Sequence, residues 1–355
     1  MRTGLALLAA AALATAADGS GAGSRGSPTL QQLIGQKLVV PMKGKAPSAS
    51  LLARARAGQI GGVIVHADNL STASALRSIA SRLQQAAAAG GQPRLLIAVD
   101  QEGGSVKAVS WIPPTLSPPQ MGRLGSGRTA QAQGEQTGKA LRGLGINIDF
   151  APVADVPASR AAFLYRQGRT WSFDPHTTAR LSGWFAIGLR EGGVVATAKH
   201  FPGLGLAWRD TDRSVVRISA SKATLAPGLK PFKTAVADHV PLIMLSNAVY
   251  TAYDPANAAA WSRAVGMTLL RSRLGFRGVT ITDSLDGAAH ARHVSAAPLA
   301  IRAANAGTDL LLLTASEPRS KSVYSSLLGA AAASRVDRAR LLASYKRILA
   351  LKSRL

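Results

Sequence analysis

Five polar residues of this sequence have the types and spacing that acid–base or nucleophilic chemistry requires. Asp283 ends the apolar run Thr-Ile-Thr-Asp, and Lys199 with His200 ends another apolar run. Asp210 and Asp212 lie two residues apart in the segment that follows His200. A carboxylate can attack an electrophilic carbon, and a second carboxyl group whose pKa is raised by a neighbouring like charge can donate a proton. The elements that carry these residues decide whether their side chains can meet.

Short, continuously apolar runs alternate with helical patterns from residue 30 onward. Such runs are typical of parallel strands that are covered on both faces. The predicted strands are 37–41, 62–66, 95–100, 146–152, 194–200, 242–247, 278–283 and 309–314. The predicted helices are 71–89, 129–144, 177–191, 222–238, 262–274, 294–306 and 335–351. Eight strands with crossovers predict an α/β fold, a single-domain TIM-like (β/α)8 barrel, with an open doubly wound sheet as the alternative.

Polar residues cluster at the C-terminal ends of the predicted strands. They are His66, Asp100 with Glu102, Asp149 with Asp155, Lys199 with His200, Asn247 and Asp283. Buried charge costs stability unless it is paired, so folding needs alone hardly explain six strands that end in this way. In barrels the C-terminal ends of the strands form the face that carries the chemistry, and the sequence predicts a site there.

The N-terminus has the pattern of a secretory signal peptide. Arg2 precedes an apolar segment that is too short to span a bilayer, and small residues follow. We therefore expect residues 1–17 to be a signal peptide, residues 18–29 a linker and residues 30–355 the barrel domain. No later segment has 18 uninterrupted apolar residues. The mature chain is thus expected to be secreted, or periplasmic at the cell envelope, without a transmembrane segment.

Composition excludes several classes of site. The 355 residues include 42 Lys and Arg against 18 Asp and Glu, a formal net charge of +24, and no cysteine. Without cysteine there is no disulfide framework, thiolate zinc site, iron–sulfur cluster or cysteine nucleophile. The basic residues are scattered and accompany no nucleic-acid-binding motif, so we expect attraction to an anionic cell envelope and no nucleic-acid partner. The histidines lack metal-ligand spacing, and we expect neither metal nor other cofactor.

Five segments together resemble glycoside hydrolase family 3, in particular its single-barrel β-N-acetylhexosaminidase branch. They are LLIAVDQEGGSV (95–106), LGINIDFAPVADV (144–156), GRTWSFDP (168–175), VVATAKHFPGLG (194–205) and LGFRGVTITDSL (274–285). The resemblance covers roughly residues 30–350. It implies a (β/α)8 barrel, a carbohydrate substrate and a retaining mechanism that passes through a covalent glycosyl-enzyme.

The resemblance also implies roles for individual residues. It makes Asp283 the nucleophile, whereas the sequence alone also allows this residue to cap the following helix. The residues implied to bind the hydroxyl groups of the cleaved sugar are Asp100, Arg169, Lys199 and His200. The residues expected to brace the end of the barrel are Asn147, Asp149 and Asp155. The Gly103-Gly104 pair is expected to form a sharp turn.

The acid/base departs from the family pattern. In the resembled branch, a loop after KHFPGHG carries Asp-Ser/Thr-His, and its histidine is implied to protonate the leaving group. Here Leu204 replaces the first histidine, Asp210 stands at the position of the partner aspartate, and Asp212 stands at that of the loop histidine. Either Asp212 or Asp210 then serves as the acid, its pKa raised by the neighbouring carboxylate, or the enzyme is slow, or the barrel only binds glycan. Asp286 adds an unexpected carboxylate near the site.

The predicted function is that of a secreted, monomeric exo-glycosidase that removes terminal β-linked N-acetylglucosamine, for example from cell-wall fragments. Two alternatives stay open. One is a barrel of the same fold that binds glycan without cleaving it or cleaves it very slowly. The other is a specificity of the β-glucosidase type.

Overall fold

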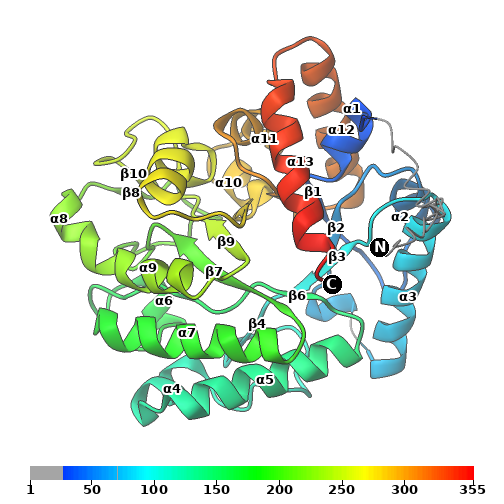
Figure 1. The fold of residues 1–355 in the computed structure, drawn as a ribbon. Coiled ribbons are helices and arrows are strands. Elements are labelled where there is room, and N and C mark those ends of the chain that lie inside the picture. The colour runs from blue at the N-terminus through cyan, green and yellow to red at the C-terminus, as the bar shows by residue number, and fades with distance from the viewer. Residues whose placement is uncertain (1–26, 70) are drawn as a thin grey trace, which may run out of the picture.

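The computed structural model of the chain describes residues 27–69 and 71–355, which form a barrel of parallel strands surrounded by helices (Figure 1). In order around the barrel the strands are β1 (Leu38–Pro41), β2 (Gly62–Ile64), β3 (Leu96–Val99), β6 (Ile148–Asp149), β7 (Val195–Phe201), β9 (Leu242–Leu245), β11 (Val279–Thr282) and β12 (Leu311–Leu312). Ile281 bridges to Leu310, and Leu310 N donates to Thr280 O at 2.8 Å, which joins β11 to β12 and closes the ring. The predicted TIM-like (β/α)8 barrel is therefore confirmed, and the open sheet is excluded.

The strands are apolar on both faces because each lies between the barrel interior and the outer helices. Val39 of β1 belongs to the apolar cluster of the interior, together with Ile64 and Leu96. Its neighbours Leu38 and Val40 belong to the larger cluster beneath the helices. Burial of both faces explains why these strands read as continuous apolar runs.

Helices follow the strands and cover the outside of the barrel (Figure 1). The described helices are α1 (Leu30–Gly35), α2 (Ala49–Arg56), η1 (Ala67–Asn69), α3 (Ala73–Ala89), α4 (Pro118–Leu124), α5 (Gly127–Gly143), α6 (Phe163–Arg166), α7 (Pro175–Glu191), α8 (Lys222–Leu225), η2 (Ala226–Leu229), α9 (Lys230–Ala237), η3 (Ala259–Trp261), the π-helix η4 (Ala264–Arg273), α10 (Leu285–Ala291), α11 (Ala296–Ala306), α12 (Glu317–Ala332) and α13 (Arg338–Lys352). The predicted helix 222–238 is divided into α8, η2 and α9, with Pro227 and Pro231 near the two junctions. Proline lacks the N–H that a continuous helix would use there.

Strand β6 is shorter than the predicted 146–152. The side chain of Asn147 bonds to the backbone of the neighbouring strand: its Oδ1 accepts from Ile97 N at 2.7 Å and its Nδ2 donates to Leu95 O at 3.0 Å. Asn147 thus braces the barrel, as expected. Within the part of the chain that the structure describes, two further small sheets lie in the loops, β4 (Gln101–Gly103) with β5 (Val106–Lys107) and β8 (Arg217–Ile218) with β10 (Val249–Tyr250).

The N-terminal ends of the strands are closed by α13 and by buried ion pairs. Asp309, which precedes β12, contacts Arg271 at 2.6 Å and Arg347 of α13 at 2.8 Å. Lys352 of α13 donates to Gly61 O at 2.7 Å. These charged side chains thus bind one another or the backbone and stabilise the fold. In barrels of this kind the active site lies at the opposite end, where the strands have their C-terminal ends.

The expected signal peptide, residues 1–17, lies outside the described residues, as does most of the expected linker, residues 18–29. The first described helix, α1, begins after Thr29, whose hydroxyl accepts a hydrogen bond from Gln32 N at 3.2 Å. Among residues 27–69 and 71–355, no helix combines the length and the apolar character that crossing a bilayer requires.

Candidate active site

A cavity of about 380 Å³ opens at the C-terminal ends of the barrel strands. Its lining includes every residue that the sequence singled out for catalysis or sugar binding, namely Asp100, Arg169, Lys199, His200, Asp210, Asp212 and Asp283. These residues come from β7, from the positions directly after β3 and β11, and from two loops, so the fold brings together side chains that are far apart in the sequence.

Lys199 lies at the centre of a charged network in the cavity wall. Its Nζ contacts Asp100 Oδ1 and Glu102 Oε1, each at 2.6 Å, and its side chain is only 2% exposed. Burial by itself lowers the pKa of Lys199, but the carboxylates of Asp100 and Glu102 outweigh burial and raise this pKa above its ordinary value. The ammonium group therefore stays charged and is held in one position by two opposite charges.

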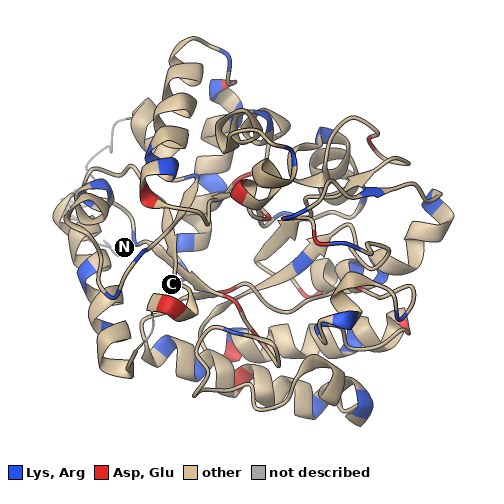
Figure 2. Cartoon of the chain, turned by 180° about the vertical axis from the view of Figure 1, so that it is seen from behind, with Lys and Arg blue, Asp and Glu red and all other residues tan. Residues whose placement is uncertain are grey.

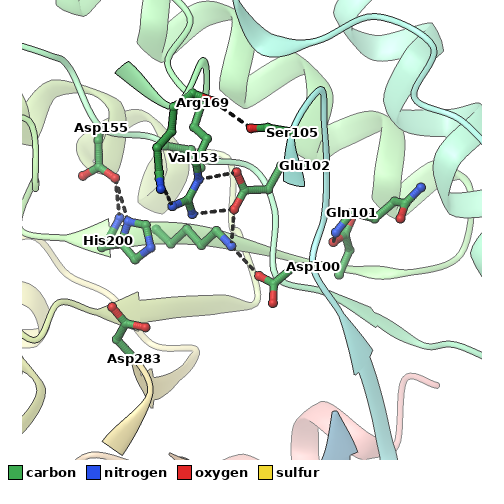
Figure 3. A network of polar contacts seen from close by, with 12 residues as sticks. Asp100, Gln101, Glu102, Ser105, Val153, Asp155, Arg169, His200 and Asp283 are labelled. Carbon is green, nitrogen blue, oxygen red and sulfur yellow. Dashed lines mark hydrogen bonds and ion pairs between the residues drawn. The ribbon is translucent and has the colours of Figure 1, made fainter. Parts of the chain in front are cut away.

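Glu102 joins Lys199 to Arg169 (Figure 3). Arg169 donates from Nε to Glu102 Oε2 at 2.8 Å and from Nη2 to Glu102 Oε1 at 2.6 Å. Burial alone would raise the pKa of Glu102, but Arg169 and Lys199 lower it to about 2. The pair of glycines after Glu102 makes the sharp turn expected for it, since Gly103 and Gly104 have φ angles of +94° and +63°.

His200 is oriented by Asp155. The Oδ2 atom of Asp155 contacts His200 Nδ1 at 2.8 Å and accepts from the His200 backbone N at 3.0 Å, and its Oδ1 accepts from Leu204 N. Asp155 is fully buried and thus serves as the brace that the sequence led us to expect. Because Asp155 engages Nδ1, the other ring nitrogen, Nε2, is the one left for a ligand in the cavity.

Asp283 follows the last residue of β11 and lines the cavity with its carboxylate directed toward the side where His200 lies (Figure 3). Its Oδ1 accepts from Ser284 N at 2.7 Å. The helix that follows, α10, is capped by Ser284, whose hydroxyl accepts from Gly287 N at 3.0 Å. The alternative in which Asp283 caps this helix is therefore not what the structure has.

Asp212 lies in the loop after β7, close to Asp283. Burial is the largest cause that raises the pKa of Asp212, followed by the charges of Asp283 and Asp210, and this pKa reaches about 8. The expected cause, the neighbouring carboxylate Asp210, thus contributes less than burial and less than Asp283. Asp210 also fixes the loop, because its Oδ1 accepts from Asp212 N at 2.9 Å.

Asp149 lies beneath the charged network and is fully buried. Its Oδ1 accepts from Gln101 N at 2.9 Å, which fits the brace role expected for it. Its Oδ2 is buried without a hydrogen-bond partner. Burial raises the pKa of Asp149 to about 8, against the opposing effects of the Gln101 hydrogen bond and Lys199. At neutral pH Asp149 is therefore mainly an uncharged acid.

Two further residues belong to the site, Glu102 and His66. Both lie at the ends of predicted strands, but neither of them has a predicted role in catalysis or sugar binding. Glu102 is the bridge of the network, and its place in the DQEGG segment is the signal that points to it. His66 lines the cavity, its Nε2 is buried without a partner, and its pKa is lowered mainly by burial.

The carboxylate of Asp286, which the sequence placed near the site, accepts from Thr314 N and Ala315 N at 2.8 and 3.0 Å and lines a second cavity.

Comparison with known proteins decides the family. Residues 29–351 match the glycosyl hydrolase family 3 N terminal domain. The chain belongs to glycosyl hydrolase family 3. The resemblance seen in the five sequence segments is therefore confirmed, and with it the enzyme class, a glycoside hydrolase.

Similar proteins come from both fungi and bacteria. A protein of Arthroderma benhamiae named an uncharacterized secreted glycosyl hydrolase is 31% identical over 327 residues, which cover 90% of this chain and 92% of that protein. A β-hexosaminidase of Alkalilimnicola ehrlichii is 32% identical over 267 residues, covering 72% of this chain and 74% of that enzyme.

Solved structures of similar proteins superimpose on most of the chain. The β-N-acetylhexosaminidase of Beutenbergia cavernae has a TM-score of 0.85 and 31% identity, covering 92% of this chain and 99% of that one. The family 3 β-N-acetylglucosaminidase of a Paenibacillus species has a TM-score of 0.89 and 31% identity, covering 92% of this chain. This chain spans only 63% of the length of the Paenibacillus enzyme.

Proposed function

We propose that the protein is a secreted, monomeric, retaining β-N-acetylhexosaminidase that hydrolyses terminal β-linked N-acetylglucosamine. Asp283 is its nucleophile and Asp212 its acid/base. One observation carries the proposal: two carboxyl groups line the same cavity, and burial together with the charge of Asp283 keeps Asp212 protonated at neutral pH. A retaining glycosidase needs one carboxylate that attacks and one acid that donates a proton.

The reaction proceeds in two balanced steps. The Asp283 carboxylate attacks the anomeric carbon while the carboxyl group of Asp212 gives its proton to the departing glycosidic oxygen, which forms the glycosyl-enzyme and frees the aglycone. Asp212, now a carboxylate, takes a proton from a water molecule that attacks the anomeric carbon. The bond to Asp283 breaks, the sugar leaves with its original configuration, and Asp212 is protonated again.

The charged network supplies the sugar-binding groups of this proposal. Lys199 keeps one of its three N–H donors after binding Asp100 and Glu102, and Asp100 is one-third exposed, so both can bond to sugar hydroxyls. His200 offers Nε2. Arg169 uses three of its five N–H donors on Glu102 and Gln167, so its contribution to the sugar is smaller and its support of Glu102 larger.

Azide products test the two catalytic roles. We expect Asp283→Gly to lose hydrolysis of a nitrophenyl N-acetyl-β-glucosaminide and to regain turnover with azide, giving the α-glycosyl azide by a single inversion. We expect Asp212→Gly with azide to give the β-glycosyl azide, because azide replaces water on the glycosyl-enzyme. A wild-type protein that binds the glycoside but never cleaves it would instead support the alternative of a non-catalytic barrel.

Substrate specificity is tested with a matched pair of substrates. The nitrophenyl β-glucoside differs from the N-acetylglucosaminide only at the 2-substituent. The proposal predicts a higher kcat/KM for the N-acetylglucosaminide. A higher value for the glucoside would favour the β-glucosidase-type alternative.

Export and envelope association are further parts of the proposal. The similar Arthroderma protein is named secreted, and residues 1–17 have the signal-peptide pattern. Lys and Arg are distributed over the outer helices (Figure 2), in keeping with the net charge of +24. Sequencing the N-terminus of the protein from the culture medium or envelope tests cleavage. Binding to isolated envelopes should weaken as salt rises, because counterions screen long-range attraction.

A further inference from the structure

The carboxyl group of Asp212 packs directly against Gly287 in the first turn of α10. A Cβ atom built on Gly287 would lie 2.2 Å from both Cγ and Oδ1 of Asp212 and 2.7 Å from its Cβ. These three atoms of Asp212 are also the nearest neighbours that such a Cβ would meet. The space that a side chain would occupy at position 287 is thus filled by the Asp212 carboxyl group.

The backbone gives no reason for a glycine at this position. Gly287 does not have the positive φ that favours glycine, and its N–H donates to Ser284 Oγ at 3.0 Å, as any residue could. In a helix, alanine is favoured over glycine by about 1 kcal/mol. What position 287 requires is therefore room for Asp212.

The same short segment carries Asp283 and Gly287, four residues apart across the start of α10. Contact with Gly287 holds Asp212 on the side of the cavity where Asp283 lies, and Asp212 Oδ1 is buried there without a hydrogen-bond partner. The charged groups that act on Asp212 in this place are Asp283, Asp210 and Asp100, which raise its pKa, and Arg169, which lowers it; burial exceeds them all.

We infer that Gly287 is a positioning residue for the acid/base, because the missing side chain at 287 forms the recess that seats the Asp212 carboxyl group beside Asp283. The inference rests on the proposed role of Asp212.

Gly287→Ala tests the recess, with Gly329→Ala as its matched control. Gly329 lies in α12, is exposed, and would place its Cβ within 4 Å of nothing. For a substrate with a poor leaving group such as chitobiose, Gly287→Ala should lower kcat/KM by about 100-fold or more, the usual contribution of a general acid. Burst-phase release of an activated dinitrophenyl aglycone should change by less than about threefold, because that aglycone needs no proton. Gly329→Ala should behave like the wild type on both substrates.

The pH profile and a double mutant separate positioning from general damage. Displacing Asp212 into water should move the alkaline limb of kcat/KM for chitobiose to lower pH or abolish it. If Gly287 acts through Asp212, Gly287→Ala combined with Asp212→Gly should match Asp212→Gly alone, since a glycine at 212 lacks the Cβ, Cγ and Oδ1 atoms that a Cβ at 287 would meet. The inference is overturned if Gly287→Ala keeps the wild-type profile, or if it slows both substrates equally and lowers the double mutant further. The proposed function fails separately, if Asp212→Ala itself spares chitobiose.

Discussion

Glu102 and Arg169 form a two-point ion pair, 2.8 Å from Nε to Oε2 and 2.6 Å from Nη2 to Oε1, and Glu102 reaches Lys199 at 2.6 Å as well (Figure 3). One carboxylate therefore contacts two cations in a region that water hardly reaches, and Asp100 supplies the second negative charge through its contact with Lys199. Because Lys199, which we propose binds the sugar, depends on this carboxylate for its position, Glu102 links the stability of the fold to the shape of the site.

Glu102→Gln should destabilise the protein by about 3–5 kcal/mol, because it leaves two buried cations with too little negative charge. Urea denaturation at pH 7 measures the change. Glu135→Gln is the matched control: Glu135 also forms a 2.6 Å pair, with Lys139, but both side chains are well exposed, so its loss should cost less than about 1 kcal/mol. Equal effects of the two substitutions would contradict the role assigned to the buried pair.

Lowering the pH should remove the stabilisation that the charge of Glu102 gives to the fold. The pKa of Glu102 is lowered to about 2, so the folded state prefers the carboxylate. Its stabilisation is fully present above the unfolded pKa of about 4.3 and is lost as the pH falls toward 2. The difference in stability between wild type and Glu102→Gln should therefore narrow over that range, as measured by urea denaturation at a series of pH values. A constant difference would mean that the charge of Glu102 is not what stabilises the fold.

Activity on poor leaving groups should fall above pH 8. The pKa of Asp212 is raised to about 8, so its proton is present below that pH and absent above it. Asp210→Asn keeps the oxygen that accepts from Asp212 N but removes a charge that raises the pKa of Asp212. Its alkaline limb in kcat/KM should lie at lower pH than that of the wild type. If the alkaline limb of Asp210→Asn stays at the wild-type pH, the charge of Asp210 does not raise the pKa of Asp212.

Asp155→Asn should disturb His200. The Asp155 carboxylate receives the backbone N–H groups of His200 and Leu204 and contacts His200 Nδ1. An amide offers only one oxygen, so at least one buried donor loses its partner, at a cost of about 1–3 kcal/mol. Nitrogen NMR of the His200 ring should report a changed tautomer balance, together with a raised KM. An unchanged ring signal would contradict the orienting role of Asp155.

Much of this architecture is predictable from sequence, and the reasons are local. Parallel strands such as β1 and β9 are buried on both faces, so each of them has an unbroken run of apolar residues in the sequence. The polar residue that follows such a run lies at the barrel mouth by geometry alone. The positions of Asp100, Lys199 and Asp283 at the mouth of the barrel therefore follow from the sequence pattern.

What sequence could not supply is the pairing between distant segments. Glu102 and Arg169 are 67 residues apart, and nothing in either segment says that they meet. The contact between Asp212 and Gly287 is of the same kind, because it depends on how a loop lies against a helix from another strand. Burial, which raises the pKa of Asp212 more than Asp210 does, is likewise a property of the assembled fold.

Asp149 leads to a prediction of opposite sign to that for Glu102. Its pKa is raised to about 8, so the folded state holds a proton that the unfolded chain releases near pH 4. The wild type should therefore lose stability relative to Asp149→Asn as the pH rises from about 4 to about 8, by on the order of 1 kcal/mol per pH unit, and the difference should level off above pH 8.

Asp309→Asn provides the matched control for Asp149→Asn. Asp309 is equally buried, but the guanidinium groups of Arg271 and Arg347 overcome its burial and hold its pKa below the usual range. Removal of its charge should destabilise the protein by a constant amount above about pH 4, since a carboxylate whose pKa is lowered by folding loses its contribution only below its unfolded pKa of about 3.9. Urea denaturation of both variants from pH 4 to pH 9 gives the comparison. If the stability of Asp149→Asn also differs from that of the wild type by a constant amount over this pH range, Asp149 does not hold a proton in the folded protein at neutral pH. The buried groups beneath Lys199 would then carry one more negative charge than proposed.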